Sequence, residues 1–408
     1  MAGGPWQRRA RAALVVAEIA VTLVLTVGAA LLIRSFARLQ NVDAGFDAAH
    51  SLAADIPLSA AKYAKDDLRT STVDRLLERT AGLPGVKGAA VTTILPMSGA
   101  GATIHFNVKG RPPANPDQWT LAGYRAVSGA YFQTMGIPLK RGRLLDAHDR
   151  QGAPRVIVIN ETMARQHFPH DDPIGQRIQL GATPDPDPQN PYMEVVGVVG
   201  DVRQQPDAEA KSEMYVPYAQ YPDPFLRRMY ANVILVVRAD GNPAALAGSV
   251  REIVRVIDSD QPLANVRTLD EVLSASVSQP RFRTVLLGCF CGIALVLAAI
   301  GVYGLLTHAV AQRTNEFGVR MALGASPSSV LALVLREGIA LALTGVAIGL
   351  FAAAAFVRVL QSVLFEVSPW DPLAWIVSAG TLLAVALFAS WLPARRAVAV
   401  DPVVTLRA

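Results

Sequence analysis

Four long apolar segments constrain the fold of this chain more than any other feature. They cover residues 12–33, 284–306, 339–357 and 373–392, and each comes close to the roughly 20 residues that a helix needs to cross a membrane. Of the 408 residues, 51% are hydrophobic and only 17% are charged, whereas an ordinary soluble domain has about 25% charged residues. The sequence therefore predicts four transmembrane helices.

Basic residues next to these segments indicate how the chain lies in the membrane. They precede the first segment, fill the loop between the second and third, and follow the fourth: Arg8, Arg9, Arg11, Arg313, Arg320, Arg336, Arg395, Arg396 and Arg407. Because loops rich in Lys and Arg stay in the cytoplasm, we expect both termini to be cytoplasmic. The net charge of +5 is then a matter of topology, and we expect no nucleic-acid partner.

This topology divides the chain into three parts. Residues 1–44 hold the N-terminus, the first transmembrane helix and a stalk, and residues 45–275 form a large extracytoplasmic domain. Residues 276–408 form a permease-like part with the other three helices and a cytoplasmic loop over 307–338. The predicted fold class is an α+β membrane protein.

The outer domain carries a βαβ pattern at each end. Periodicity predicts strand, helix and strand over 51–57, 65–80 and 86–95, and again over 232–238, 243–257 and 263–269. These two units could close as one split ferredoxin-like sheet. Between them, about 100–225, we predict a β-rich insertion with strands over 103–108, 121–127, 155–160, 178–180 and 192–199. The proline-rich tract 181–192 is expected to be a loop.

Two further helical segments lead between the outer domain and the membrane. Residues 34–40 continue the first transmembrane helix outward, and 269–278 approach the second, where Pro280 is expected to interrupt the helix. Such a pair of stalks could transmit a tilt of the membrane helices, although a passive tether fits the same residues.

A short amphipathic segment, 313–327, lies in the cytoplasmic loop. Read as a helix, it places Phe317 and Met321 on one stripe and the oppositely charged Glu316 and Arg320 on the neighbouring one. Such a helix suits the groove of a partner protein, with the two apolar side chains as anchors.

The same segment has residues that end and begin helices. Gly324 suits the end of a helix, and Ser326 followed by Pro327 suits the N-cap and first turn of the next one. We therefore expect a compact helix between two membrane helices, which serves as the contact with a separate motor protein.

Motifs for enzyme chemistry are absent from the sequence. It contains no G-x-x-x-x-G-K-[ST] phosphate loop, no H-E-x-x-H pair, no G-x-S-x-G elbow and no C-x-x-C. His167, His170, Asp171 and Asp172 could ligate a metal, but Pro169 opposes a regular helical pair, so a solvated turn is favoured. We predict no catalytic, cofactor-binding or metal-ligating residues and no enzyme activity.

Several motifs taken together resemble one family. They are Arg313–Ser326, the C-terminal Pro393–Arg407, and the outer segments Tyr131–Arg143 and Ile159–Pro169 with Asp172–Gly175. As a set, in this order along the chain, they resemble the MacB/FtsX-type ABC transporter permeases. The sequence is especially similar to one half of the permeases in which this module is duplicated.

The resemblance implies a fold, a location and partners. It implies a homo- or heterodimer of four-span permeases in the bacterial inner membrane, with a periplasmic domain made of a porter-like part and a β-rich part. Its partners would be a cytoplasmic ABC ATPase that binds ATP and Mg²⁺ and a periplasmic adaptor. The family is associated with efflux and with mechanotransmission, in which ATP-driven closure moves the outer domains. The coupling helix would use Glu316, Phe317, Gly318, Arg320, Met321, Leu323 and Gly324.

One departure from the family bears on the partner. Family members often carry the ATPase in the same chain, whereas here about ten residues precede the first apolar segment. We therefore expect a free-standing half-permease or a fragment of a duplicated one, with its motor supplied from elsewhere. The alternative is a membrane-anchored sensor or scaffold that passes a signal from the outer domain to a cytoplasmic regulator.

Overall fold

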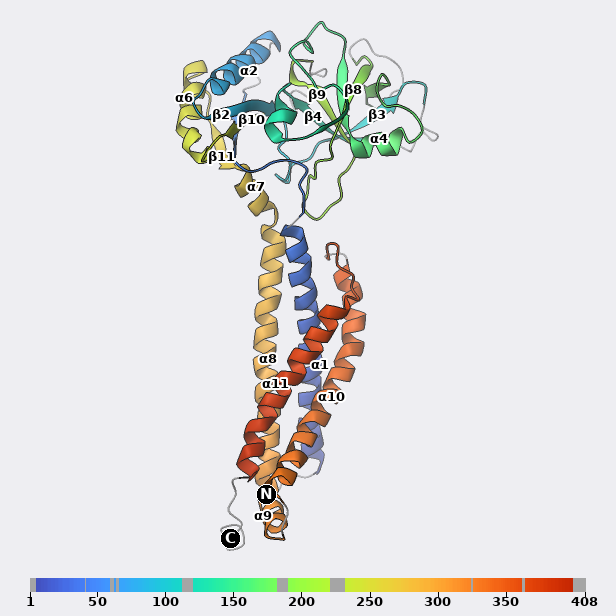
Figure 1. The fold of residues 1–408 in the computed structure, drawn as a ribbon, viewed down its shortest axis with the longest axis vertical. Coiled ribbons are helices and arrows are strands. Elements are labelled where there is room, and N and C mark those ends of the chain that lie inside the picture. The colour runs from blue at the N-terminus through green and yellow to red at the C-terminus, as the bar shows by residue number, and fades with distance from the viewer. Residues whose placement is uncertain are drawn as a thin grey trace. The chain divides into compact units, whose positions relative to one another are not determined.

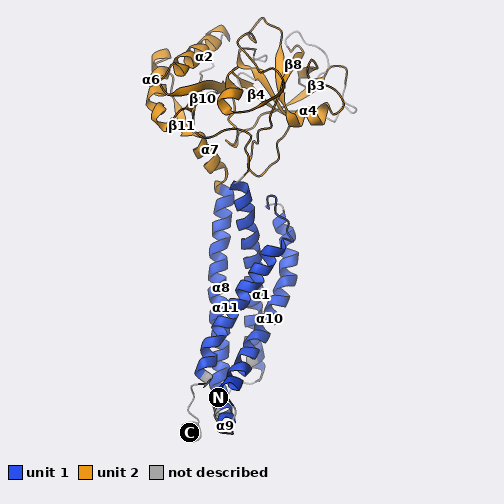
Figure 2. Cartoon of the chain, viewed as in Figure 1, with its two compact units in different colours: residues 1–41, 279–408 blue, residues 42–278 orange. Residues whose placement is uncertain are grey.

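The computed structural model divides the chain into two compact units. It describes residues 5–40, 42–58, 62–63, 66–111, 120–181, 190–220, 232–323, 326–361 and 364–398. The first unit is Met1–Asn41 with Gln279–Ala408, and the second is Val42–Ser278 (Figure 2). The predicted borders were placed after residues 44 and 275.

The first unit is helical. Its helices are α1 (Pro5–Gln40), α8 (Ser278–Gln312), α9 (Thr314–Ala322), α10 (Pro327–Leu360) and α11 (Pro372–Val398). Within the described residues, α1, α8, α10 and α11 are the helices long and apolar enough to cross a membrane. The four predicted spans are therefore confirmed.

Glycines allow α1 and α10 to pack closely. Gly345 and Gly349 of α10 face Ile19 and Leu23 of α1, and a Cβ atom at Gly349 would lie 2.9 Å from the Cβ of Leu23 and 3.0 Å from the carbonyl oxygen of Ala20. Small residues four apart let membrane helices approach at the backbone. Figure 1 shows α1, α10 and α11 side by side, in agreement with their contacts.

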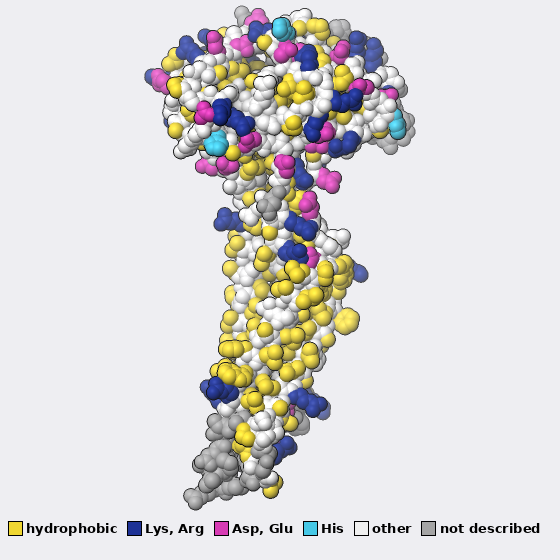
Figure 3. Space-filling model, in the orientation of Figure 1, with side chains coloured by type: hydrophobic (Ala, Val, Ile, Leu, Met, Phe, Trp, Pro, Cys, Tyr) yellow, Lys and Arg dark blue, Asp and Glu magenta, His cyan; other side chains and the backbone are white. Residues whose placement is uncertain are grey.

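Helix α8 is much less covered than α1. Its buried residues form a narrow stripe of Cys291, Ala298, Val302 and Leu306. Large apolar side chains cover the rest of its outward surface: Phe282, Val285, Leu286, Phe290, Ile293, Val296, Leu297 and Ile300. The space-filling view shows hydrophobic side chains along the helices (Figure 3), as a surface that faces lipid or another apolar partner requires.

The second unit contains a split ferredoxin-like fold. Its elements are β1 (Ser51–Pro57), α2 (Asp66–Ala81), β2 (Val86–Thr92), β10 (Asn232–Ala239), the 3₁₀ turn η2 (Pro243–Leu246), α6 (Ala247–Ile257) and β11 (Ala264–Thr268). The strands are antiparallel in the order β11-β1-β10-β2. The predicted closure of the two βαβ units into one sheet is confirmed.

Both faces of this sheet are buried. One face packs on α2 and α6 (Figure 1), and Val73 and Val250 of these helices belong to the same buried cluster as Leu235 of β10. The other face packs on α3 (Tyr131–Met135) and α7 (Leu269–Ser276). This double cover explains why β10 reads as a nearly continuous apolar run.

A closed barrel is inserted between β2 and β10. It consists of β3 (Thr103–Val108), β4 (Leu121–Val127), β6 (Val156–Asn160), β7 (Arg177–Leu180), β8 (Met193–Val199) and β9 (Glu213–Pro217). The strand order is β4-β3-β7-β8-β6-β9, and β9 pairs in parallel with β4, so the sheet closes on itself. The short strand β5 (Leu139–Gly142) pairs with β8, and α4 (Glu161–His167) follows β6. The sequence predicted a β-rich insertion, but not β5, β9 or the closure.

One predicted helix break lies elsewhere. Helix α7 ends at Ser276 with Val277 as its C-cap, and α8 begins at Ser278 with Pro280 inside its first turn. The prediction that Pro280 interrupts the helix is wrong, because the first turn of a helix tolerates a residue without an N–H. The core of the proline-rich tract, 182–189, lies outside the described residues.

Candidate coupling site at helix α9

The main apolar contact between helix α9 and the rest of the transmembrane unit is made by the aromatic side chain of Phe317. Phe317 is 2% exposed and packs in a cluster with Val330 and Val334 of α10 and Ala394 of α11. Burying a phenylalanine side chain stabilises a contact by about 1.5–3 kcal/mol. A displacement of α9 must therefore move α10 and α11 or break this cluster.

Polar contacts hold the ends of the neighbouring helices. Arg313, the residue before α9, donates from Nη1 to Oε1 of Glu337 in α10 at 2.5 Å. Arg396 of α11 donates from Nη1 to the hydroxyl of Tyr303 in α8 at 2.8 Å, and its guanidinium lies over the same ring. The start of α9 and the end of α11 are thus fixed to different helices of the unit.

The outward surface of α9 differs from the predicted one. Phe317 and Met321 were expected to be anchors for a partner, but Phe317 is buried, and the half-buried Met321 packs against the same cluster. Apolar residues of α10 and α11 cover this stripe, so a partner protein cannot reach it. The exposed apolar residues are Val319, at 44%, and Leu323, at 83%.

Two charged residues flank this exposed apolar pair. Arg320 donates from Nη2 to Oε1 of Glu316 at 2.6 Å, the i,i+4 ion pair that the sequence predicted. Both side chains are about half exposed, so a partner that contacts Val319 and Leu323 also meets them. The sequence contained the signal for this face, since Val319 and Leu323 are also four residues apart.

Of the two glycines predicted to belong to the coupling segment, the structure describes one. Gly318 lies in the middle of α9, whereas Gly324 lies outside the described residues. Helix α10 begins at Pro327 with Ser326 in an extended N-cap conformation, as predicted, although the Ser326 side chain makes no capping hydrogen bond.

The residues weighed as metal ligands have other contacts. Asp171 pairs with Arg111, and Asp172 accepts a hydrogen bond from Nη2 of Arg141 at 2.8 Å. The ring of His167 lies edge-on against Phe106 with 5.0 Å between the centroids, and burial lowers its pKa. Each of the two aspartate carboxylates is therefore already paired with an arginine.

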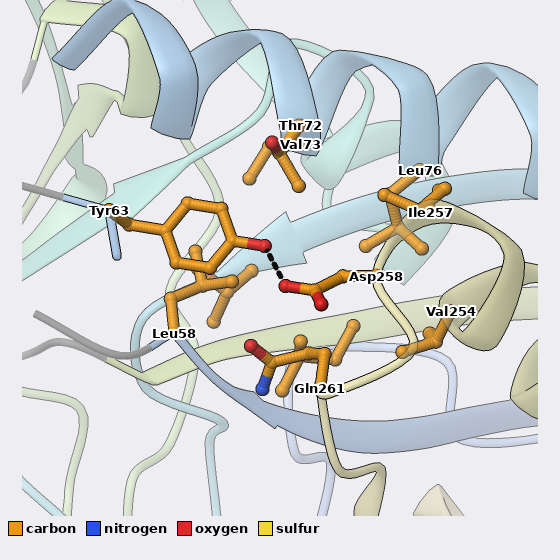
Figure 4. Close-up of a pocket in the computed structure, with 11 residues that line it drawn as sticks. Leu58, Tyr63, Thr72, Val73, Leu76, Val254, Ile257, Asp258 and Gln261 are labelled. Atoms are coloured by element: carbon orange, nitrogen blue, oxygen red, sulfur yellow. Dashed lines mark hydrogen bonds between the residues drawn. The ribbon is translucent and has the colours of Figure 1, made fainter. Parts of the chain in front are cut away.

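A small apolar pocket lies between α2, α6 and the sheet of the second unit (Figure 4). The hydroxyl of Tyr63 donates to Asp258 across it, and Lys62 donates to the same carboxylate at 2.6 Å. These two hydrogen bonds lower the pKa of Asp258, while burial raises the pKa of Tyr63 to about 12. The cavity measures about 20 Å³, room for about one water molecule, so it is a packing feature rather than a substrate site.

Four spanning helices, a large domain between the first two and a short amphipathic helix between the second and third are typical of a multi-span membrane protein of the permease type. The family model for the MacB-like periplasmic core domain matches residues 13–253, and that for the FtsX-like permease C-terminal region matches residues 288–402. The chain belongs to the MacB/FtsX-like ABC permease family.

Curated relatives agree with this assignment. The macrolide export ATP-binding/permease protein MacB of Escherichia coli K12 is 28% identical over 287 residues, which cover 69% of this chain and 43% of that protein. The uncharacterized ABC transporter permease YknZ of Bacillus subtilis is 25% identical over 298 residues, 71% of each chain. The chain therefore spans less than half the length of its MacB relatives.

Solved structures of outer domains are also similar to part of the chain. The periplasmic region of MacB from Actinobacillus actinomycetemcomitans aligns with 59% of this chain and 98% of its own, at 14% identity and a TM-score of 0.38. The extracellular domain of YknZ from Gram-positive bacteria aligns with 52% of this chain at 18% identity and a TM-score of 0.32.

Proposed function

We propose that this chain is the permease subunit of an ABC-type export or mechanotransmission complex, without catalysis of its own. A cytoplasmic partner ATPase would bind ATP and Mg²⁺ and act on α9. The observation that supports this most is the two-sided character of α9: Phe317 is buried in the transmembrane unit, while Val319 and Leu323 are exposed. A helix of this kind can receive a movement on one face and pass it on through the other.

The contacts within the transmembrane unit support a path for this movement. From α9 it passes to α10 through Phe317 and the Arg313–Glu337 pair. From α10 it passes to α1 through the close packing at Gly345 and Gly349.

At the other end of the bundle, α1 is tied to the segment between α10 and α11. Arg34 pairs with Asp371, and the backbone N–H of Phe365 donates to Oγ of Ser35 at 2.8 Å. Since α1 leads into the outer domain along the chain, a displacement of the bundle would reach that domain.

The remaining partners follow from the same proposal. The exposed apolar face of α8 suits a second permease protomer, identical or related, within the bilayer. The basic residues at the ends of the helices support a cytoplasmic location for both termini and α9, with the second unit in the periplasm. A periplasmic adaptor would then contact that unit.

The proposal is tested by separating the two faces of α9. In the double variant Val319→Asp and Leu323→Asp, we expect the ABC ATPase that co-purifies with the wild-type chain in mild detergent to fall at least about tenfold, as hot-spot loss at an interface does. The melting temperature of the permease should change little, because both side chains are exposed.

Phe317→Ala is the matched control for the buried face. It should lower the melting temperature while leaving the exposed residues in place. Undiminished ATPase binding by the double variant would refute the assignment of α9. Co-purification of a partner that does not hydrolyse ATP would favour the sensor or scaffold alternative.

A further inference from the structure

A large cleft lies within the second unit, between α2 and the barrel. Its volume is about 530 Å³, within the range of sites for small molecules. Helix α2 forms one wall, and the residues after β4, β5 and β9 form the other. At the start of α2, Nε of Arg69 donates to the hydroxyl of Tyr218 at 2.7 Å and so joins the two walls.

Part of the cleft lining is apolar. Side chains from α2, from β2 and from the segments after β4 and β5 contribute to it: Val73, Leu77, Ala81, Ala89, Val127 and Leu145. A ligand with an apolar body would remove this surface from water, which favours its binding in proportion to the area covered.

The charges that line the cleft are mostly negative. Asp74, Glu78, Asp146 and Asp149 are acidic, and Arg150 is the one basic residue among the lining residues that the structure describes. Asp149 is buried and satisfied internally, because Arg143 donates to it through two hydrogen bonds of 2.8 Å. Asp74 and Glu78 are exposed, whereas Asp146 also lies 3.5 Å from Nη1 of Arg143.

Two of these carboxylates are on α2. Asp74 and Glu78 are exposed and make no ion pair with any described residue. They are four residues apart on one helix face, where two like charges repel each other and destabilise the helix. A cation bound between them would relieve this repulsion.

Asp146 adds a third negative charge from the opposite wall. It accepts a hydrogen bond from the backbone N–H of His148 at 2.7 Å, which holds its pKa below the ordinary value. It is therefore ionised at neutral pH. It also lies 3.5 Å from Nη1 of Arg143, but that single guanidinium pairs with Asp149 as well, so the two aspartates keep one net negative charge. Carboxylates thus lie on both walls of a cleft that also has apolar side chains in its lining.

We infer that this cleft binds a small organic cation with an apolar body, with the cationic group between Asp74, Glu78 and Asp146 and the apolar part against the apolar side chains of the lining. Charge complementarity selects this class over anionic ligands, which would be repelled by the net negative charge of the lining carboxylates. The site lies entirely in the outer domain and does not depend on α9 or on the partner ATPase.

The test uses ethidium, a water-soluble aromatic cation, with the purified full chain in lipid nanodiscs. We expect saturable binding in fluorescence polarisation after subtraction of empty nanodiscs, and weaker binding as the salt concentration rises. The double variant Asp74→Asn and Glu78→Gln should weaken it about tenfold or more, since it removes two charges close to the cation. Ala147→Trp, which adds a large ring to the cleft lining, should weaken binding as well.

The control removes the same charge elsewhere in the domain. Asp67→Asn with Glu209→Gln changes two exposed carboxylates outside the cleft lining and should leave ethidium affinity unchanged. Absence of saturable binding would overturn the inference. So would equal losses in the cleft variant and the control variant, or equally tight binding of the anionic dye 8-anilinonaphthalene sulfonate.

Discussion

Tyr63 and Asp258 join two segments that are 195 residues apart in the chain. The Asp258 side chain is only 6% exposed and accepts from both Tyr63 and Lys62. These hydrogen bonds connect the chain after β1 to the end of α6, and both Tyr63 and Asp258 line the pocket of Figure 4. They therefore connect two distant segments on the helical face of the ferredoxin-like sheet.

These hydrogen bonds make the free energy of unfolding depend on pH. Because the pKa of Asp258 in the folded chain is below its ordinary value of 3.8, the ionised form stabilises the fold above that pH, and the effect fades as the pH falls through the folded pKa. At pH 7, Asp258→Asn should lower the melting temperature of the outer domain, followed by aromatic circular dichroism, by about 2–8 °C. Its difference from wild type should shrink toward pH 3; a difference independent of pH would contradict this.

A buried ion pair between β4 and β9 leads to a second prediction. Nη2 of Arg125 donates to Oε1 of Glu213 at 3.0 Å, both side chains are 2% exposed, and Tyr215 donates to the same carboxylate at 2.7 Å. Removing one partner leaves the other charge buried without compensation, at a cost of about 3–5 kcal/mol. Glu213→Leu should therefore greatly increase hydrogen exchange in β4 and β9.

The double variant Arg125→Met and Glu213→Leu serves as the comparison. It should be less destabilised than the sum of the two single variants, because neither charge then remains buried alone. Simple additivity would show that the pair does not act as a unit.

Among the helices, α1 and α10 depend on the absence of side chains at two positions. A Cβ atom at Gly345 would lie 2.5 Å from Cγ2 of Ile19, too close to be accommodated without movement. The double variant Gly345→Ala and Gly349→Ala should lower the melting temperature of the detergent-purified protein, at a cost of about 1–3 kcal/mol for overpacking.

Helix α11 offers a control with the same chemistry. A Cβ atom added at Gly380 would have no described neighbour within 4 Å, so Gly380→Ala should leave the melting temperature nearly unchanged. An equal loss in the control and in the α10 variant would point to backbone effects instead of helix contact.

For individual elements, local sequence patterns predicted the bounds of several strands, but they did not predict which strands pair over long distances in the chain. The strands 51–57, 103–108 and 121–127 were predicted with the bounds that the structure gives. Strand β9 was missed because Glu213 and Pro217 at its ends are poor strand formers, and its pairing with β4 joins residues about 90 apart. Periodicity cannot reveal such a contact.

The candidate site shows the same division. The helix 314–322 and its ion pair followed from local spacing, but this short helix has two apolar stripes. Only the position of Val330, Val334 and Ala394 decides that the stripe with Phe317 is the buried one. The coupling role itself stays a prediction.

At the scale of the whole molecule, each unit carries its own hydrophobic core. The two clusters of the outer domain draw their buried residues from 42–278, and the two clusters of the transmembrane unit draw theirs from the rest of the chain. We therefore expect a fragment of residues 42–278 to fold as a soluble monomer with the hydrogen-exchange protection of the full chain.

A shorter fragment, 66–239, provides the contrast. It lacks β1 and β11, so β10 loses its partner β1 and becomes an exposed apolar edge of the sheet. This fragment should aggregate in size-exclusion chromatography. If the longer fragment also aggregated, the outer domain would depend on the membrane helices for its fold.

The strand order has a consequence for how the protein is made. Strand β1 pairs only with β10 and β11 in the described sheet, and about 175 residues separate its end from the start of β10. At a synthesis rate of about 5–20 residues per second, β1 waits about 10–35 s for its first partner strand. During this interval a largely apolar segment of the nascent chain lacks its partner strands, so we expect the outer domain to depend more on a folding chaperone than a domain whose first strand pairs at once.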